Sequence, residues 1–307
     1  MTSSGLIHSG DAVAEAPRLR RTLRTREPSP LTGRAGWFVR GALLVICFLW
    51  LVPAVGLLVT SFRTPGAALS SGWWTVVTKP FTEWTVGNYS EVLREGGWNA
   101  SLNSFVVSLP ATIIPILFAA FAAYAFTFME FPGRDWFFIL IVGLLVVPLQ
   151  VAIVPLFQIF GDLGLTGTFA SVWLAHAGFG MPLAIFILRG YMATLPRGII
   201  ESAKIDGASH FQTFWRLIVP MSVPALAAFA IFQFLWTWND LLVALIFLGP
   251  GEREVLTVQV AGLIGAQQQG WQLLTAGAFI SMIVPLLVFL FLQRYFVRGL
   301  TAGAVKG

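Results

Sequence analysis

The chain has 307 residues, of which 57% are hydrophobic and only 11% are charged. Because soluble domains carry about 25% charged residues, this composition excludes an ordinary water-soluble protein and indicates lipid as the solvent. A single cysteine excludes an internal disulfide. The formal net charge is +5, but no folded basic domain is present to bind nucleic acid.

The N-terminal segment 1–36 is polar and rich in Arg, Ser, Thr and Pro. It has no compact apolar region followed by small residues, which a cleaved signal peptide would have. We therefore expect a disordered basic tail on the cytoplasmic side, followed by a membrane domain over 37–307.

Six long apolar runs follow the tail, and each reaches the roughly 20 residues that cross a bilayer as a helix. Prolines within the runs, Pro148 among them, predict kinks that suit a bundle bending around a pathway. The chain is thus predicted to be an all-α membrane protein. Its transmembrane helices are expected near 39–62, 104–128, 136–160, 169–190, 221–247 and 273–296.

The basic residues set the expected orientation in the membrane. With the N-terminus taken as cytoplasmic, 15 of the 19 Lys and Arg residues fall on the cytoplasmic side and four on the opposite side. By the positive-inside rule, both termini and the loop 194–220 are expected to face the cytoplasm.

Two loops on the opposite side are long enough to have roles of their own. The first, 63–97, carries Trp73, Trp74 and Trp84, and Trp98 follows it directly. These four tryptophans fit either an aromatic belt at the headgroups or a docking surface. The second, 248–272, is polar and rich in Gly and Gln. It is either a plain solvated connection or a segment that reaches toward a ligand or partner.

The cytoplasmic loop 194–220 holds four charged residues between two apolar spans. Glu201, either Lys204 or Ile205, and Ala208 share one helical face by their spacing. Asp206-Gly207 is a turn signal that would end a short helix. Two interpretations stay open from these residues. The loop is either a compact docking knob or an amphipathic helix that lies flat on the headgroups.

A family resemblance favours the docking knob. The string Glu201-Ser202-Ala203, then Gly207, then Leu217-x-Val219-Pro220, resembles the coupling motif of bacterial ABC importer permeases, with Ser202 and Val219 as mild departures. Almost the whole chain after residue 35 resembles carbohydrate permeases of the maltose and α-glucoside type. Further segments that carry the resemblance are Phe131-Pro132-Gly133-Arg134, Val147-Pro148-Leu149-Gln150, Leu188-Arg189, Trp238-Asn239-Asp240 and Val305-Lys306-Gly307.

The resemblance implies a type I importer permease with six transmembrane helices and a cytoplasmic coupling helix between the fourth and fifth. It implies four kinds of companion: a second homologous permease, two copies of an ATPase that bind ATP and Mg, an extracytoplasmic sugar-binding protein, and membrane lipid. Loop 248–272 becomes a candidate to enter the binding protein. The location implied is the bacterial inner membrane. The residues expected to contact the ATPase are Glu201, Ser202, Ala203, Asp206, Gly207 and Ala208.

The chain itself shows no source of chemical energy. None of its three lysines follows a Gly-rich phosphate loop, so the Walker A pattern is absent, and no nucleophile–base pair or metal-ligand spacing appears. We therefore expect a non-enzymatic subunit that binds no cofactor. Ion-coupled carriers need ionisable groups within the bundle, and here the candidates are few, chiefly Asp240 and His176. A stand-alone ion-coupled carrier is the alternative.

A sugar path needs aromatic faces together with amide or carboxylate groups. Polar residues within the predicted spans could line such a path, or could equally form hydrogen bonds to neighbouring helices. The candidates are Asn103, Gln150, Gln158, Gln233, Trp236, Trp238, Asn239 and Asp240.

Overall fold

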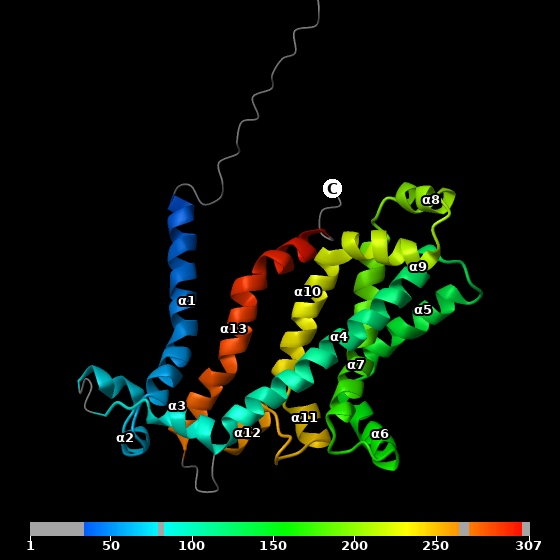
Figure 1. Ribbon diagram of the computed structural model, residues 1–307. Helices are drawn as coiled ribbons and strands as arrows, with labels where there is room; N and C mark the ends of the chain where they lie inside the picture. Colours follow the sequence, from blue (N-terminus) through cyan, green and yellow to red (C-terminus); the bar gives the residue numbers. More distant parts are fainter. Residues whose placement is uncertain (1–33, 79–82, 264–269, 303–307) are drawn as a thin grey trace, which may run out of the picture. The chain divides into compact units, whose positions relative to one another are not determined.

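The computed structural model describes residues 34–78, 83–263 and 270–302. Helices make up almost all of the regular structure in these ranges, and the β-structure there is one isolated bridge between Arg63 and Trp84. The all-α prediction is therefore confirmed. The chain divides into two units, 1–53 and 54–307, which are described separately (Figure 1). Most of the expected tail, 1–36, lies outside the described residues.

The first unit is described from residue 34, where α1 (Arg34–Ser61) begins. This helix continues through Pro53, and its stretch Gly36–Ser61 is long and apolar enough to cross a membrane. It corresponds to the first predicted span.

Four long helices form the centre of the second unit: α4 (Trp98–Phe128), α7 (Phe169–Met192), α10 (Val219–Trp238) and α13 (Trp271–Ala302). Helix α4 packs against α7 and α10, and α10 packs in turn against α13. Small residues permit the close approach of these backbones. At Gly180 of α7, for example, an added Cβ would lie 2.6 Å from the Oε1 atom of Gln233 on α10.

The third predicted span differs from the continuous helix expected over 136–160. It is built from α5 (Arg134–Gly143), the short 3₁₀ turn η3 (Leu144–Val146) and α6 (Leu149–Asp162), and the pair is bent by 103°. The cause is Pro148, because a residue that precedes proline avoids the helical region. Val147 accordingly has an extended backbone, with φ −71° and ψ 118°.

The fifth predicted helix, 221–247, is also interrupted. Helix α10 ends at Trp238, and α11 (Leu242–Phe247) begins after a break of three residues. Asp240 lies in this break, and its carboxylate accepts a hydrogen bond from the backbone N–H of Ala244 at 3.1 Å. A polar residue at a helix start stabilises the new helix by satisfying a free N–H. A short helix, α12 (Leu256–Gly262), follows before α13.

The segment before α4 is a small folded region. It contains α2 (Pro65–Ser70), η1 (Trp73–Val77), α3 (Gly87–Val92) and the π-turn η2 (Leu93–Gly97). Arg63, whose side chain is 1% exposed, donates to the carbonyl of Ser71 at 2.7 Å and pairs with Glu83 at 3.3 Å. The buried guanidinium thus joins parts of the segment that are distant in sequence. Trp74 of this segment and Trp98, the first residue of α4, are 63% and 62% exposed, as either a belt or a docking surface would require.

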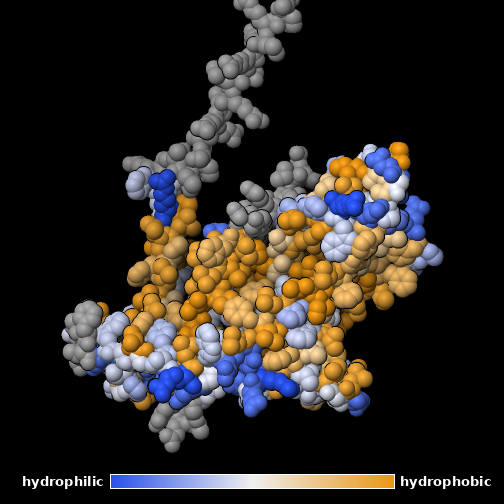
Figure 2. All heavy atoms as spheres, in the orientation of Figure 1, coloured by the Kyte–Doolittle hydropathy of each residue, from blue (hydrophilic) through white to orange (hydrophobic). Residues whose placement is uncertain are grey.

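Among the described residues, five helices are long and apolar enough to span a membrane, or six if the bent α5–α6 pair counts as one span. Figure 2 shows an apolar band across the second unit, with hydrophilic residues gathered at the end that carries α8 and at the opposite end, near α12. We refer to these as the α8 end and the α12 end. The α8 end is formed by α8 (Arg197–Ile205), α9 (His210–Thr213) and the π-turn η4 (Phe214–Ile218).

Candidate functional site

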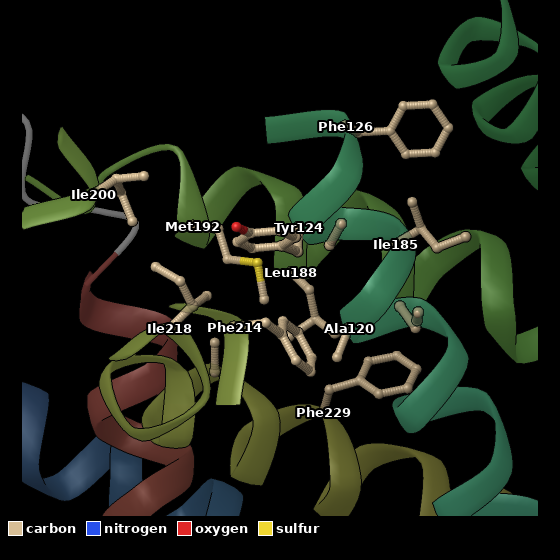
Figure 3. Packing of buried hydrophobic residues seen from close by; sticks show 14 residues of the cluster. Ala120, Tyr124, Phe126, Ile185, Leu188, Met192, Ile200, Phe214, Ile218 and Phe229 are labelled. Atoms are coloured by element: carbon tan, nitrogen blue, oxygen red, sulfur yellow. The ribbon is translucent and has the colours of Figure 1, made fainter. Parts of the chain in front are cut away.

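Helix α8 is attached to the bundle by one apolar side chain. Ile200 is 5% exposed and belongs to a buried cluster that includes Met192 of α7 and Phe214 and Ile218 of η4 (Figure 3). The same cluster contains α4 and α10 residues, so it joins every helix that surrounds the insert. Ala203, 7% exposed, is buried on the same side of α8. One side of the insert is therefore packed against the bundle.

Glycine at position 207 has a backbone reason in the structure. It adopts φ +76°, a left-handed conformation that glycine reaches without the strain of a Cβ. The N–H of Gly207 donates to the carbonyl of Lys204 at 3.1 Å, and the N–H of Ala208 donates to the carbonyl of Ala203 at 2.9 Å. These two bonds form a Schellman motif, which ends α8 and turns the chain back toward α9.

The turn after α8 is fixed by side-chain hydrogen bonds. Ser209 and Gln212 form a reciprocal capping box at the start of α9, with contacts of 2.9 and 3.3 Å. The hydroxyl of Tyr124, on α4, lies 3.0 Å from Nδ1 of His210. The capping box and the tyrosine together hold the insert in one position relative to α4.

The free surface of α8 combines charge with one large apolar side chain. Glu201, Ser202 and Lys204 are exposed, and Ile205 is 86% exposed. Of the residues expected to contact an ATPase, Glu201, Ser202, Asp206 and Gly207 are exposed, Ala208 is half-buried, and Ala203 faces the bundle.

The residues considered for a sugar path do not converge. Asn103 donates to the carbonyls of Glu252 and Glu254, both at 2.9 Å, and so holds the fifth loop against α4. Gln150 and Gln158 lie on α6 with exposed side chains. These three residues belong to two different helices and make different contacts.

The remaining path candidates lie near the end of α10. Trp238 is buried, and its indole N–H donates to the carbonyl of Ser281 at 3.0 Å. Asn239 is exposed and donates to the carbonyl of Leu235 at 2.7 Å. Trp236 meets His176 edge to face, at 5.3 Å between ring centroids.

A buried polar junction lies between α7 and α10. Gln233 is fully buried and donates to the carbonyls of Ala111 at 3.3 Å and His176 at 3.4 Å. Nε2 of His176 lies 3.6 Å from the Asp240 carboxylate. Neither ring nitrogen of His176 makes a hydrogen bond within the described part of the chain. The sequence identified His176 and Asp240 only as separate ionisable residues. Their spacing along the chain gives no sign that the two side chains lie close together.

The described part of the fifth loop, 248–263, is folded onto its neighbours. The N–H of Leu256 donates to Oγ of Ser104 at 2.9 Å, and Arg253 donates to the carbonyl of Gly167 at 2.8 Å. The hydroxyl of Thr257 donates to the carbonyl of Asp240 at 2.6 Å. The portion 264–269 lies outside the described residues. Within the ranges that the structure covers, no three or more His, Cys, Asp or Glu residues gather as a metal site would require.

Comparisons with known proteins identify the family. The model of the binding-protein-dependent transport system inner membrane component matches residues 101–302. The chain is 56% identical to the osmoprotective compounds uptake permease protein GgtD of Synechocystis sp., over 86% of this chain and 90% of the relative. It is 53% identical to the alpha-glucoside transport system permease protein AglG of Rhizobium meliloti, over 81% of this chain and 67% of the relative.

A solved structure supports the fold. A chain of a bacterial ABC transporter involved in the import of the acidic polysaccharide alginate superposes with a TM-score of 0.71, covering 86% of this chain and 97% of that chain. At 20% identity this likeness concerns the fold alone. The family match and this fold confirm the prediction of a permease subunit of an ABC transporter. In such a transporter, ATP is hydrolysed by separate ATPase subunits. The chain belongs to the binding-protein-dependent transport system inner membrane components, and is the non-catalytic, multi-pass inner-membrane permease of an ABC importer.

Proposed function

We propose that this permease imports an α-glucoside, a di- or oligosaccharide delivered by an extracytoplasmic sugar-binding protein. The 53% identity to a permease named for α-glucoside transport supports this substrate class. A second candidate substrate is an osmoprotective compound, because the chain is 56% identical to a permease named for such compounds.

In the proposed complex the chain pairs with a second homologous permease above two ATPase subunits, which bind ATP and Mg. Both termini and α8 face the cytoplasm. The concentration of basic residues near α8 supports this orientation, because Arg189, Arg197, Lys204 and Arg216 all flank or belong to the insert.

The attachment of α8 to the helix bundle is the observation that supports the coupling role. An ATPase that holds the exposed residues Glu201, Ser202 and Asp206 would move a helix whose Ile200 is embedded in a cluster shared by α4, α7 and α10. Close-packed side chains transmit displacement because they leave few voids to absorb it. Movement of α8 would therefore move the ends of three membrane helices together.

The candidate sugar-path residues differ in whether their side chains are free to contact a sugar. Asn103, Gln233 and Trp238 already donate to backbone carbonyls, so we assign them to helix and loop packing. Gln150 and Gln158 are exposed, with side chains available to a sugar. Asn239 is also exposed, although its amide donates to the carbonyl of Leu235, and Trp236 and Asp240 lie close to it in sequence. Carbohydrate sites need such groups, but the second permease could supply most of them.

Charge reversal on α8 tests the coupling role. In the full complex reconstituted in liposomes, Glu201→Lys should reduce sugar-stimulated ATP hydrolysis at least about tenfold, which corresponds to about 1.4 kcal/mol of lost interaction. Glu130→Lys is the matched control, because Glu130 is an exposed glutamate just after α4 and outside the insert. Unchanged stimulation in Glu201→Lys would refute the coupling role.

Uptake assays with the same complex separate the substrate classes. We expect labelled maltose or trehalose to accumulate in an ATP-dependent manner, and an osmoprotective compound such as glycine betaine not to compete. If the osmoprotective compound is taken up and the sugars are not, the second candidate substrate, an osmoprotective compound, is favoured. Uptake by this chain alone under an ion gradient, without ATP, would instead support the ion-coupled carrier.

A further inference from the structure

Three arginines line one small cavity at the α8 end. The cavity has a volume of about 160 Å³, and Arg134, Arg189 and Arg197 surround it. They come from the start of α5, the last turn of α7 and the first residue of α8 (Figure 1). The other lining residues are Phe126, Thr127, Phe128 and Ala193, so no carboxylate lines the cavity.

The positive charge of this cavity is only partly balanced. Within the described residues, neither Arg189 nor Arg197 forms an ion pair. Arg134 contacts the carboxylate of Asp135 at 3.3 Å, but that carboxylate is 74% exposed. Like charges that converge repel one another, and an anion held between them removes this repulsion. The cavity therefore favours an anionic ligand.

The guanidinium of Arg189 is held in place for such a ligand. It lies over the ring of Phe138, 3.9 Å from the centroid. Stacking on an aromatic ring occupies the face of a guanidinium and leaves the N–H groups at its edge free to donate. Those N–H groups match the oxygens of a phosphate group, which arginine binds through two parallel hydrogen bonds.

An apolar surface begins beside the arginines. On α5, Trp136 is 79% exposed, Phe137 is 55% exposed and Leu140 is 64% exposed. Tryptophan is enriched at the boundary between headgroups and acyl chains, and basic cavities between membrane helices bind anionic headgroups. A soluble phosphate compound would use the arginines but not this surface.

We propose that the cavity binds the phosphate of an anionic phospholipid, whose acyl chains lie along the exposed side of α5. A cavity needs roughly 10–15 Å³ to hold one water, so a volume of about 160 Å³ leaves room for a phosphate group. The bound headgroup connects Arg197, at the start of α8, to α5 and α7. Lipid binding does not depend on the proposed transport function. An effect of the bound lipid on coupling through α8 would depend on that function.

Lipid titration of the purified full-length chain, followed by native mass spectrometry, tests the site. Phosphatidylglycerol should bind at least about tenfold more tightly than phosphatidylcholine with the same acyl chains, as expected for charge-assisted hydrogen bonds. The triple variant Arg134→Gln, Arg189→Gln and Arg197→Gln should lose this preference. The control variant Arg94→Gln with Arg216→Gln should keep it, because neither arginine lines the cavity.

A single-residue variant and two competition outcomes complete the test of the lipid site. If the triple variant does not fold, Arg197→Gln alone, which changes an exposed side chain, should weaken phosphatidylglycerol binding several-fold. Equal binding of the two lipids to the parent chain, or a preference that survives in the arginine variants, would overturn the proposal. Displacement of phosphatidylglycerol by inorganic phosphate at equal concentration would show that a soluble phosphate is the ligand and would also overturn it.

Discussion

The two ends of the second unit are stabilised in different ways. At the α8 end, Ile200, Phe214 and their neighbours form an apolar cluster, while the residues that face outward make few contacts. At the α12 end, buried apolar clusters include Phe247, Val255 and Leu256. There the segments are joined in addition by polar side chains that bond to backbone carbonyls and amides, as Arg63, Asn103 and Ser104 do.

The difference matches two mechanical demands. A close-packed apolar cluster moves as a body, which suits an element that passes a displacement into several helices. Hydrogen bonds between side chains and backbone are directional, and at the α12 end they fix the register of loops in addition to the apolar contacts there. We propose that the α8 end transmits motion and that the α12 end holds loops in a defined arrangement. Variants that remove each kind of contact should separate these two roles.

The largest effect is expected at the α12 end from Arg63→Ala. The side chain of Arg63 is 1% exposed and that of Glu83 is 29% exposed, so the pair is partly buried. Removing the guanidinium should cost up to about 3–5 kcal/mol, because Glu83 and the carbonyl of Ser71 lose their donor. The thermal unfolding temperature of the detergent-solubilised chain should fall, and proteases should cut within 65–78. Arg63→Lys keeps the charge and should lose less. Equal stability of the alanine variant and the parent would contradict the role of Arg63.

A matched pair on α8 tests the apolar attachment. Ile200→Ala removes a buried side chain and should destabilise the α8 end by about 2–4 kcal/mol, whereas Ile205→Ala alters an exposed one and should cost under about 0.5 kcal/mol. In the reconstituted complex, Ile200→Ala should leave ATP hydrolysis uncoupled from uptake, because α8 is no longer fixed to the bundle. If the two variants have the same stability and coupling, α8 is not attached through Ile200.

A pair of glycines gives the smallest effects, which should have opposite signs. Gly207→Ala places a Cβ at φ +76° and should cost about 1–2 kcal/mol. Gly198→Ala adds a methyl group within α8 where nothing lies within 4 Å, and should gain up to about 1 kcal/mol of helix stability. Hydrogen exchange of the α8 amides measures both. Faster exchange in Gly198→Ala than in Gly207→Ala would contradict the helix boundaries.

Much of the fold could be predicted from the sequence because apolar length and loop charge act locally. The positions of α4, α7 and α13 follow from uncharged runs, and the turn at Asp206-Gly207 follows from glycine's backbone freedom. Local signals did not give the size of the bend at Pro148. A proline predicts a kink, but neighbouring helices decide whether the chain bends slightly or by 103°.

The candidate sites show the same limit. The exposed residues of α8 could be predicted because they are consecutive in a motif. Pairings such as His176 with Asp240, or Asn103 with the carbonyl of Glu252, join residues on different elements, and no spacing in the sequence reveals them. The arginine cavity was not predicted either, because the positive-inside rule places Arg134, Arg189 and Arg197 on one side of the membrane without bringing them together.

Cysteine cross-linking in the assembled complex tests most directly whether α8 is the element that the ATPase holds. In a Cys47→Ser background, which removes the only native cysteine, Ser202→Cys is compared with Ser90→Cys, an exposed serine of α3 near the α12 end. We predict that a short bifunctional reagent joins position 202 to the ATPase subunit and leaves position 90 unjoined to it. Labelling of position 202 only from the outer side of the membrane, or its cross-linking to the binding protein, would contradict the account.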